Sequence, residues 1–174
     1  MKKQNWGIVV ACACAAYVSH AAPLNAREAN IIKARLAPAP KHVELADGPD
    51  VVLDDALAVT LVCAKEGELA EKQVRETFKA WFGCRPKVTA AAPGDTVPQT
   101  ADAYRIVSAK GTLRIEAADA GGTRNAMRTL RQLAEPLRGT RTLTSYFIPE
   151  TVIDDAPAMA FRGFHLCWFP ENTP

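Results

Sequence analysis

A change of hydrophobic period within residues 111–137 constrains the fold of this chain more than any other feature. In its first part, apolar and polar residues alternate, which is the period of a strand with one face on a core. Apolar residues then recur every three or four positions, as along one side of a helix. Asp119 stands between the two patterns and is the expected helix cap, and the pair Gly121-Gly122 allows the strand and the helix to approach closely. A strand followed by a packed helix predicts a two-layer α/β domain.

The rest of the chain predicts more strands and one further long helix. The near-continuous apolar run at residues 57–64 is typical of a central strand buried on both faces. Residues 66–82 carry a helical stripe that Gly83 ends. A short helix is expected at residues 24–36. Weaker strands are expected at residues 42–46, 51–53, 87–91, 103–108 and 142–148. The expected fold is α/β, an α+β two-layer sandwich of four or five strands with two long helices.

Charge and composition exclude several classes of protein. The 174 residues are 48% hydrophobic and 23% charged, which is ordinary for a globular domain and unlike a disordered or collagen-like chain. The formal charge is +2, and two lysines near the N-terminus supply it. Without them the 21 basic residues become 19, equal to the 19 acidic ones. A neutral chain gives no argument for nucleic acid or an anionic membrane as a partner.

Residues 1–21 are predicted to be an export signal. Two lysines precede an apolar run at residues 6–18, and a small-x-small cleavage site ends at Ala21. The run is too short to span a bilayer. The chain is therefore expected in the periplasm or outside the cell. The alternative is a lipoprotein anchored through Cys12, because the preceding residues resemble a lipobox.

The cysteines indicate no metal site. Cys63, Cys84 and Cys167 follow the signal, an odd number for an exported chain. Cys63 and Cys84 either form a disulfide or remain buried free thiols, and the sequence leaves both open. There is no C-x-x-C spacing, no nearby histidine and no H-E-x-x-H, so we expect neither a metal nor a cofactor.

Two stretches carry a resemblance to a known family. The strand followed by A-A-D-A-G-G (117–122) and a helix ending in T-L-R-Q-L (129–133) resembles the non-catalytic N-terminal domain of glycoside hydrolase family 20, the β-N-acetylhexosaminidases. The same domain precedes barrels in the O-GlcNAcase-like and α-glucuronidase families. Residues 152–157 and 161–166 are similar to the linker and the opening R-G strand of the family 20 barrel.

The resemblance implies a domain organisation. Residues 22–150 would form the zincin-like accessory domain and residues 151–160 the linker. Residues 161–174 would form the first strand of a truncated (β/α)8 barrel. The accessory domain would pack on its own C-terminal barrel and stabilise it.

The resemblance also implies a chemistry that the chain alone lacks. The family removes terminal N-acetylhexosamine from glycans, using the substrate's 2-acetamido oxygen and an adjacent Asp-Glu pair on a later barrel strand. No Asp-Glu dipeptide occurs here, and the doublets Asp54-Asp55 and Asp154-Asp155 are interpreted as turn or linker residues. The chain alone is predicted to be inactive, with no catalytic residue.

Arg162 is the single residue that takes a substrate-binding role from the family, because it matches the arginine of the R-G motif. There its guanidinium would bind hydroxyls of the sugar whose bond is broken.

The alternative to an enzyme fragment is a stand-alone carbohydrate-binding or structural module. A carbohydrate-binding module needs exposed aromatic rings that stack on sugars. Trp81 is interpreted as the apolar end of a helix, so Trp168 remains as the candidate for such a ring. A stripe formed by Arg124, Arg128 and Arg131 is interpreted as a solvated helix face, the alternative being a surface for an acidic partner or sugar-acid polymer.

Overall fold

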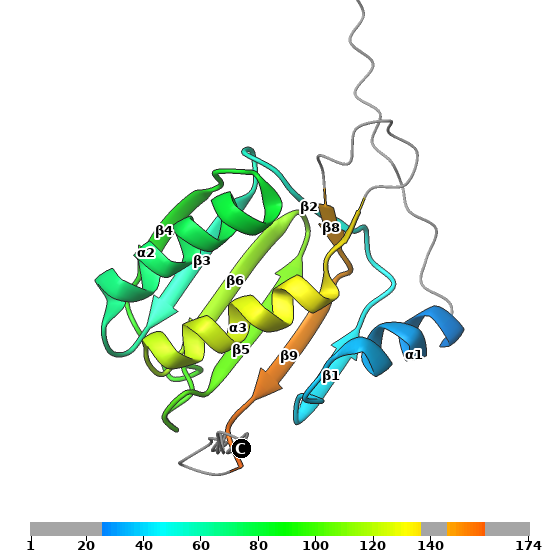
Figure 1. The fold of residues 1–174 in the computed structure, drawn as a ribbon. Coiled ribbons are helices and arrows are strands. Elements are labelled where there is room, and N and C mark those ends of the chain that lie inside the picture. The colour runs from blue at the N-terminus through cyan, green and yellow to red at the C-terminus, as the bar shows by residue number, and fades with distance from the viewer. Residues whose placement is uncertain (1–25, 137–145, 159–174) are drawn as a thin grey trace, which may run out of the picture.

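The computed structural model describes residues 26–136 and 146–158, which form a sheet covered on one face by helices (Figure 1). The helices are α1 (Ala26–Arg35), α2 (Gly67–Thr77), which continues into the π-helical turn η1 (Phe78–Phe82), and α3 (Ala120–Leu133). Helices α2 and α3 lie side by side on the sheet, and α1 lies beside its β1 edge.

Two sheets account for the strands of the described residues. The larger has the order β1-β9-β5-β6-β3-β4, and the smaller has the order β2-β8-β7. Strand β3 is parallel to β4 and β6, and the other pairings are antiparallel. The bounds of the strands are β1 His42–Leu45, β2 Val51–Leu53, β3 Ala58–Cys63, β4 Lys87–Ala91, β5 Tyr104–Ala109, β6 Thr112–Ala117, β7 Glu135–Pro136, β8 Tyr146–Ile148 and β9 Thr151–Asp155.

The unit predicted at residues 111–137 is the centre of the domain, as β6 followed by α3. The Asp119 carboxylate accepts a hydrogen bond from the Gly122 amide at 2.8 Å, which confirms the expected cap. The same carboxylate accepts from the Asp102 amide at 3.1 Å. One side chain therefore connects the start of α3 to the loop that enters β5.

The core lies between the sheet and the two long helices. Ile115 of β6 and Ile106 of β5 face Leu130 of α3, and all three side chains are fully buried. Helix α2 adds Val74, and η1 adds Phe78. Each such side chain contributes about 1.5–3 kcal/mol on leaving water, so burial of this layer stabilises the domain.

The structure corrects two predictions about secondary structure. The helix predicted at residues 66–82 is α-helical only to Thr77, and its last turn is π-helical. The described residues form nine strands in two sheets rather than four or five. Short strands such as β7 have too few residues to show a period of their own, so the sequence pattern does not reveal them.

The predicted boundary at residue 150 is also wrong, because the first residues of the expected linker form β9. Thr151–Asp155 pairs with β1 on one side and β5 on the other. Its partners are distant in sequence, so no local pattern indicates the pairing. The remaining linker residues described, 156–158, carry no helix or strand.

Gly122 provides a test of the contact between β5 and α3. A Cβ atom there would overlap the carbonyl oxygen of Ala103, which is backbone and cannot swing away. We expect Gly122→Ala to lower the free energy of unfolding by about 1–3 kcal/mol in urea denaturation. Gly67→Ala is the matched control, because a Cβ at the start of α2 meets nothing within 4 Å. Equal urea midpoints for the two variants would contradict the tight contact.

Candidate functional site

Arg162, the predicted sugar ligand, lies outside the described residues. So do the predicted signal at residues 1–21 with Cys12, and the predicted barrel strand at residues 161–174 with Trp168. Their roles stay predictions.

The first acidic doublet is confirmed as a turn. The Asp54 carboxylate accepts from the amides of Ala56 and Leu57 at 2.9 and 3.0 Å. The Asp55 carboxylate accepts from the Arg85 amide at 2.6 Å. Both side chains therefore hold backbone in place and do not face each other as a catalytic pair.

The second doublet lies in strand β9 and not in a linker, so its interpretation as linker residues is wrong. Asp154 has its carboxylate 3.6 Å from the Arg105 guanidinium on the open face of the sheet. Asp155 accepts from the Lys41 amide at 3.4 Å and lines a groove on the helix side. Successive strand residues point to opposite faces, so the two carboxylates have different surroundings.

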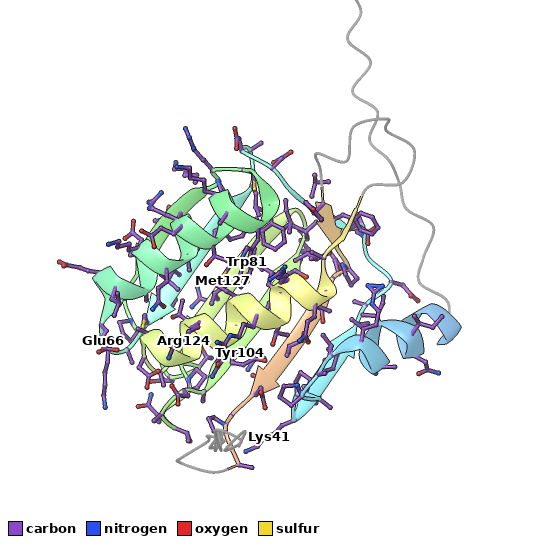
Figure 2. The ribbon with its side chains drawn as sticks, viewed as in Figure 1. Lys41, Glu66, Trp81, Tyr104, Arg124 and Met127 are labelled. Carbon is purple, nitrogen blue, oxygen red and sulfur yellow. The ribbon has the colours of Figure 1, made fainter. Side chains whose placement is uncertain are left out.

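A polar groove on the helix side of the domain is the best candidate site in the part of the chain that is described. It has a volume of about 620 Å³, within the range of small-molecule sites. Figure 2 shows Trp81, Tyr104 and Arg124 around α3. The residues lining this groove, which we name the α3 groove, are Ala37, Pro38, Trp81, Tyr104, Asn125, Arg128, Thr129, Arg131, Gln132, Asp155 and Pro157.

Trp81 and Arg131 form one wall of the α3 groove. Trp81 lies in η1, where its neighbour Phe82 is buried, while the Trp81 ring is only half-buried. The Arg131 guanidinium carbon lies 4.8 Å from the centre of that ring, within the distance of a cation–π contact. The interpretation of Trp81 as only the apolar end of a helix is therefore incomplete.

The arginines of α3 are exposed, as predicted, and two of them also line the α3 groove. Within the described ranges, no carboxylate forms an ion pair with Arg124, Arg128 or Arg131. Arg128 and Arg131 are groove residues, whereas Arg124 is not. Within the described ranges, the Arg128 guanidinium therefore lines the groove without an ion pair.

Hydrogen bonds fix the other walls. Gln132 accepts from the Ala37 amide at 2.9 Å and donates to the Ala37 carbonyl at 2.8 Å, so α3 holds the segment after α1 by two bonds. The Asn125 side chain donates to the Asp102 carbonyl at 3.2 Å. Hydrogen bonds to backbone therefore hold the side chains of Gln132 and Asn125 in place.

Tyr104 lies at the bottom of the α3 groove and is 3% exposed. Its hydroxyl shares a hydrogen bond of 2.5 Å with the Thr129 hydroxyl. Burial raises the pKa of Tyr104 to about 12, and the Asp155 carboxylate adds to the rise. The tyrosine is a neutral hydrogen-bonding group at physiological pH, not a base.

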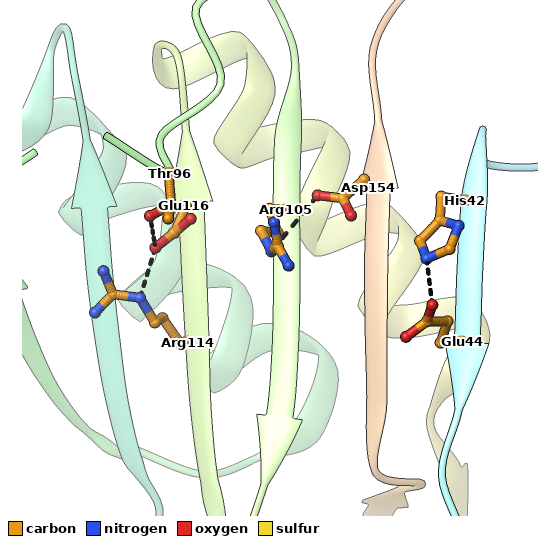
Figure 3. A network of polar contacts seen from close by, with 7 residues as sticks. All are labelled: His42, Glu44, Thr96, Arg105, Arg114, Glu116 and Asp154. Atoms are coloured by element: carbon orange, nitrogen blue, oxygen red, sulfur yellow. Dashed lines mark hydrogen bonds and ion pairs between the residues drawn. The ribbon is translucent and has the colours of Figure 1, made fainter. Parts of the chain in front are cut away.

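The opposite face of the sheet carries contacts between polar and charged side chains (Figure 3). The Arg114 guanidinium lies 2.6 Å from Glu116, and His42 lies 3.0 Å from Glu44. Glu116 also accepts from the Thr96 hydroxyl at 3.0 Å and is only 3% exposed. The alternation of residues along the strand indicates that Glu116 faces solvent or a second layer. The loop containing Thr96 covers it, so its carboxylate is buried.

The cysteines of the described residues are both free, so the open alternative of a Cys63–Cys84 disulfide is not realised. The Cys63 thiol donates to the Lys65 carbonyl, and burial raises its pKa. Burial, with Asp55 and Asp54 nearby, raises the pKa of Cys84 to about 11. Both thiols are poor nucleophiles at neutral pH.

The described residues contain no group of side chains able to hold a metal ion. Among their helices, none is long and apolar enough to cross a bilayer.

No local pattern identifies Tyr104, Asn125 or Asp155 as candidates for a site, because they come from β5, α3 and β9. Packing alone brings them together with Trp81. The arginine stripe is the one signal in the sequence that points toward this surface.

A family model and a curated relative point to the same family. The model of glycosyl hydrolase family 20, domain 2, matches residues 33–156. A β-N-acetylhexosaminidase from Cellulomonas fimi is 30% identical over 141 residues, which are 74% of this chain and 27% of the relative. The chain therefore spans about a quarter of that relative's length.

Solved structures show the same fold. The family 20 β-N-acetylhexosaminidase of Streptomyces coelicolor A3(2) superposes with a TM-score of 0.58 and 22% identity, covering 82% of this chain and 29% of that one. The exo-β-N-acetylglucosaminidase of Vibrio harveyi gives a TM-score of 0.58 at 20% identity, covering 75% and 20%.

The buried Tyr104 makes stability sensitive to alkaline pH. Its pKa is about 12 in the folded protein against an ordinary value of 10.0, so the folded state retains the proton at higher pH than the unfolded state. This contribution to the free energy of unfolding is fully present below about pH 10 and is lost as the pH rises toward about 12. In Tyr104→Phe we expect lower stability at pH 7, by about 1 kcal/mol, because the bond to Thr129 is gone. We also expect the free energy of unfolding of Tyr104→Phe to fall less steeply between about pH 10 and 12 than that of the unmodified protein.

Urea denaturation of the two proteins at a series of pH values in this range checks the prediction. An equally steep fall in both proteins would contradict it.

Proposed function

The chain belongs to glycosyl hydrolase family 20, and from that membership we propose that it is the N-terminal part of an exported β-N-acetylhexosaminidase. The full-length enzyme would hydrolyse terminal N-acetylhexosamine from glycans. The family match over residues 33–156 is the observation that carries the proposal, because it includes nearly all of the described domain. The name of the Cellulomonas fimi relative supports the same activity.

In this proposal the chemistry belongs to a catalytic barrel that follows the domain. The chain spans about a quarter of its curated relative, and its sequence contains no Asp-Glu dipeptide. The chain alone would therefore be inactive. Arg162 would bind the sugar whose bond is broken, with a guanidinium that donates to sugar hydroxyls from the first barrel strand.

The domain's own role would be to stabilise that barrel by packing against it. The described domain has a complete core of its own, as an accessory domain needs. Its large exposed apolar side chains, Ile31, Val52 and Leu69, come from three different elements. Contact with the barrel would therefore use polar groups as well as apolar ones.

Export rests on the sequence of residues 1–21, where basic residues precede an apolar run and a small-residue cleavage site. The destination would be the periplasm or the extracellular space, and anchoring through Cys12 is the alternative.

A stand-alone carbohydrate-binding module is the second candidate function. The half-buried Trp81 in the α3 groove favours it, because an aromatic ring beside polar groups suits a sugar. The coding DNA beyond residue 174 distinguishes the two candidates. A continuing frame that encodes a barrel with an Asp-Glu pair supports the enzyme, and a stop codon supports the module.

Arg162 gives a test in the longer protein. We expect Arg162→Ala to lower kcat/KM on a chromogenic N-acetyl-β-glucosaminide by about 10- to 100-fold, because hydrogen bonds from a charged group to the sugar are lost. Arg124→Ala is the control, since Arg124 is exposed on α3 outside the groove. Unchanged kinetics in Arg162→Ala would remove Arg162 from the substrate site. If the unmodified longer protein does not hydrolyse the chromogenic substrate, the proposal that it is an enzyme is contradicted.

A further inference from the structure

We propose that the α3 groove is a carbohydrate subsite that binds a unit of an N-acetylhexosamine oligosaccharide through Trp81, Arg128 and Asp155. The identity of the sugar rests on the proposed function. The site itself rests on the geometry of the groove.

The first argument is the chemistry of the lining. A sugar offers hydroxyls that both donate and accept hydrogen bonds, together with an apolar ring face. The α3 groove supplies donors in Arg128 and Asn125, an acceptor in the Asp155 carboxylate and an aromatic ring in Trp81. This combination, in a volume of about 620 Å³, matches a small polar ligand with one apolar face.

The second argument is the local backbone that carries Trp81. The α-helix changes to a π-helical turn at Phe78, and within that turn Phe78 and Phe82 are buried while Trp81 borders the groove. Single π-helical turns are rare and are frequent at functional sites. The Arg131 guanidinium lies 4.8 Å from the ring centre and adds a cation–π contact to the ring.

The third argument is that the groove is formed before any ligand enters. Two hydrogen bonds between the Gln132 side chain and the Ala37 backbone hold one wall of the groove. The hydrogen bond between the Tyr104 and Thr129 hydroxyls holds the bottom. Arg128 is exposed, and no carboxylate of the described residues forms an ion pair with it. A preformed site loses less entropy on binding.

The groove carries charges of both signs, which suits a ligand that both donates and accepts hydrogen bonds. Arg128 and Arg131 alone would suit a carboxylate-bearing ligand, but Asp155 lines the same groove and would repel it. Pro157 also lines the groove, so the chain beyond Pro157 is the competing occupant.

The test is calorimetric titration of the 174-residue chain with tetra-N-acetylchitotetraose. We expect saturable binding that weakens about tenfold in Arg128→Gln, which removes a charged donor. Arg124→Gln is the matched control from the same exposed face of α3 and should bind like the unmodified chain. Trp81→Leu should weaken binding at least as much. Since Trp81 contacts Arg131 and could be needed for folding, the decisive comparison is between the two exposed arginines.

Three outcomes would overturn the subsite. They are an absence of saturable binding, equal binding by Arg128→Gln and Arg124→Gln, and tighter binding of a polyuronate than of the chito-oligosaccharide. A fourth concerns the longer protein. If it hydrolyses a chromogenic substrate but has lost the binding measured on the 174-residue chain, the segment after the domain occupies the groove and the subsite fails. If it binds through Arg128 but does not hydrolyse, the proposed function fails and the subsite stands.

Discussion

The carboxylate of Asp119 is the contact on which the arrangement of this domain depends. It accepts from the amide of Gly122 at the start of α3 and from the amide of Asp102 just before β5. Asp102 has a φ of 60°, a left-handed conformation that an aspartate tolerates better than most residues. Two backbone segments therefore converge on one side chain. The absence of a side chain at Gly122 lets the helix approach Ala103 closely enough for this to happen.

Much of the fold could be predicted wherever a period is long and local. The β6–α3 unit, the central strand β3 and the course of α2 all follow from apolar spacing within one segment. Strand β9 has no such signal, because its partners, β1 and β5, lie far away in sequence, and the linker predicted in its place is wrong. The π-helical turn η1 escapes prediction for a different reason, since one residue more per turn hardly alters the spacing of apolar positions.

The candidate site is harder to predict than the fold, because it belongs to no single segment. Taken separately, the patterns around Trp81 and Arg131 indicate a core residue and a solvated face. Only the packing of η1 against α3 brings the guanidinium over the ring. Glu116 shows the same limitation, because its burial depends on Thr96 in a loop whose path no periodicity reveals. Arg162, taken from a motif, lies outside the described residues.

Strand β9 also sets the order in which the domain can be completed during synthesis. In the described sheets, β1 pairs with β9 and with no other strand. During synthesis β1 leaves the ribosome early, because it lies near the N-terminus. Its partner β9 follows more than 100 residues later, as the pairing of Glu44 with Val152 shows. The edge of the sheet next to β5 stays open for that time. The larger sheet can be completed only after β9 has emerged, so the domain reaches its final pairing late in its own synthesis.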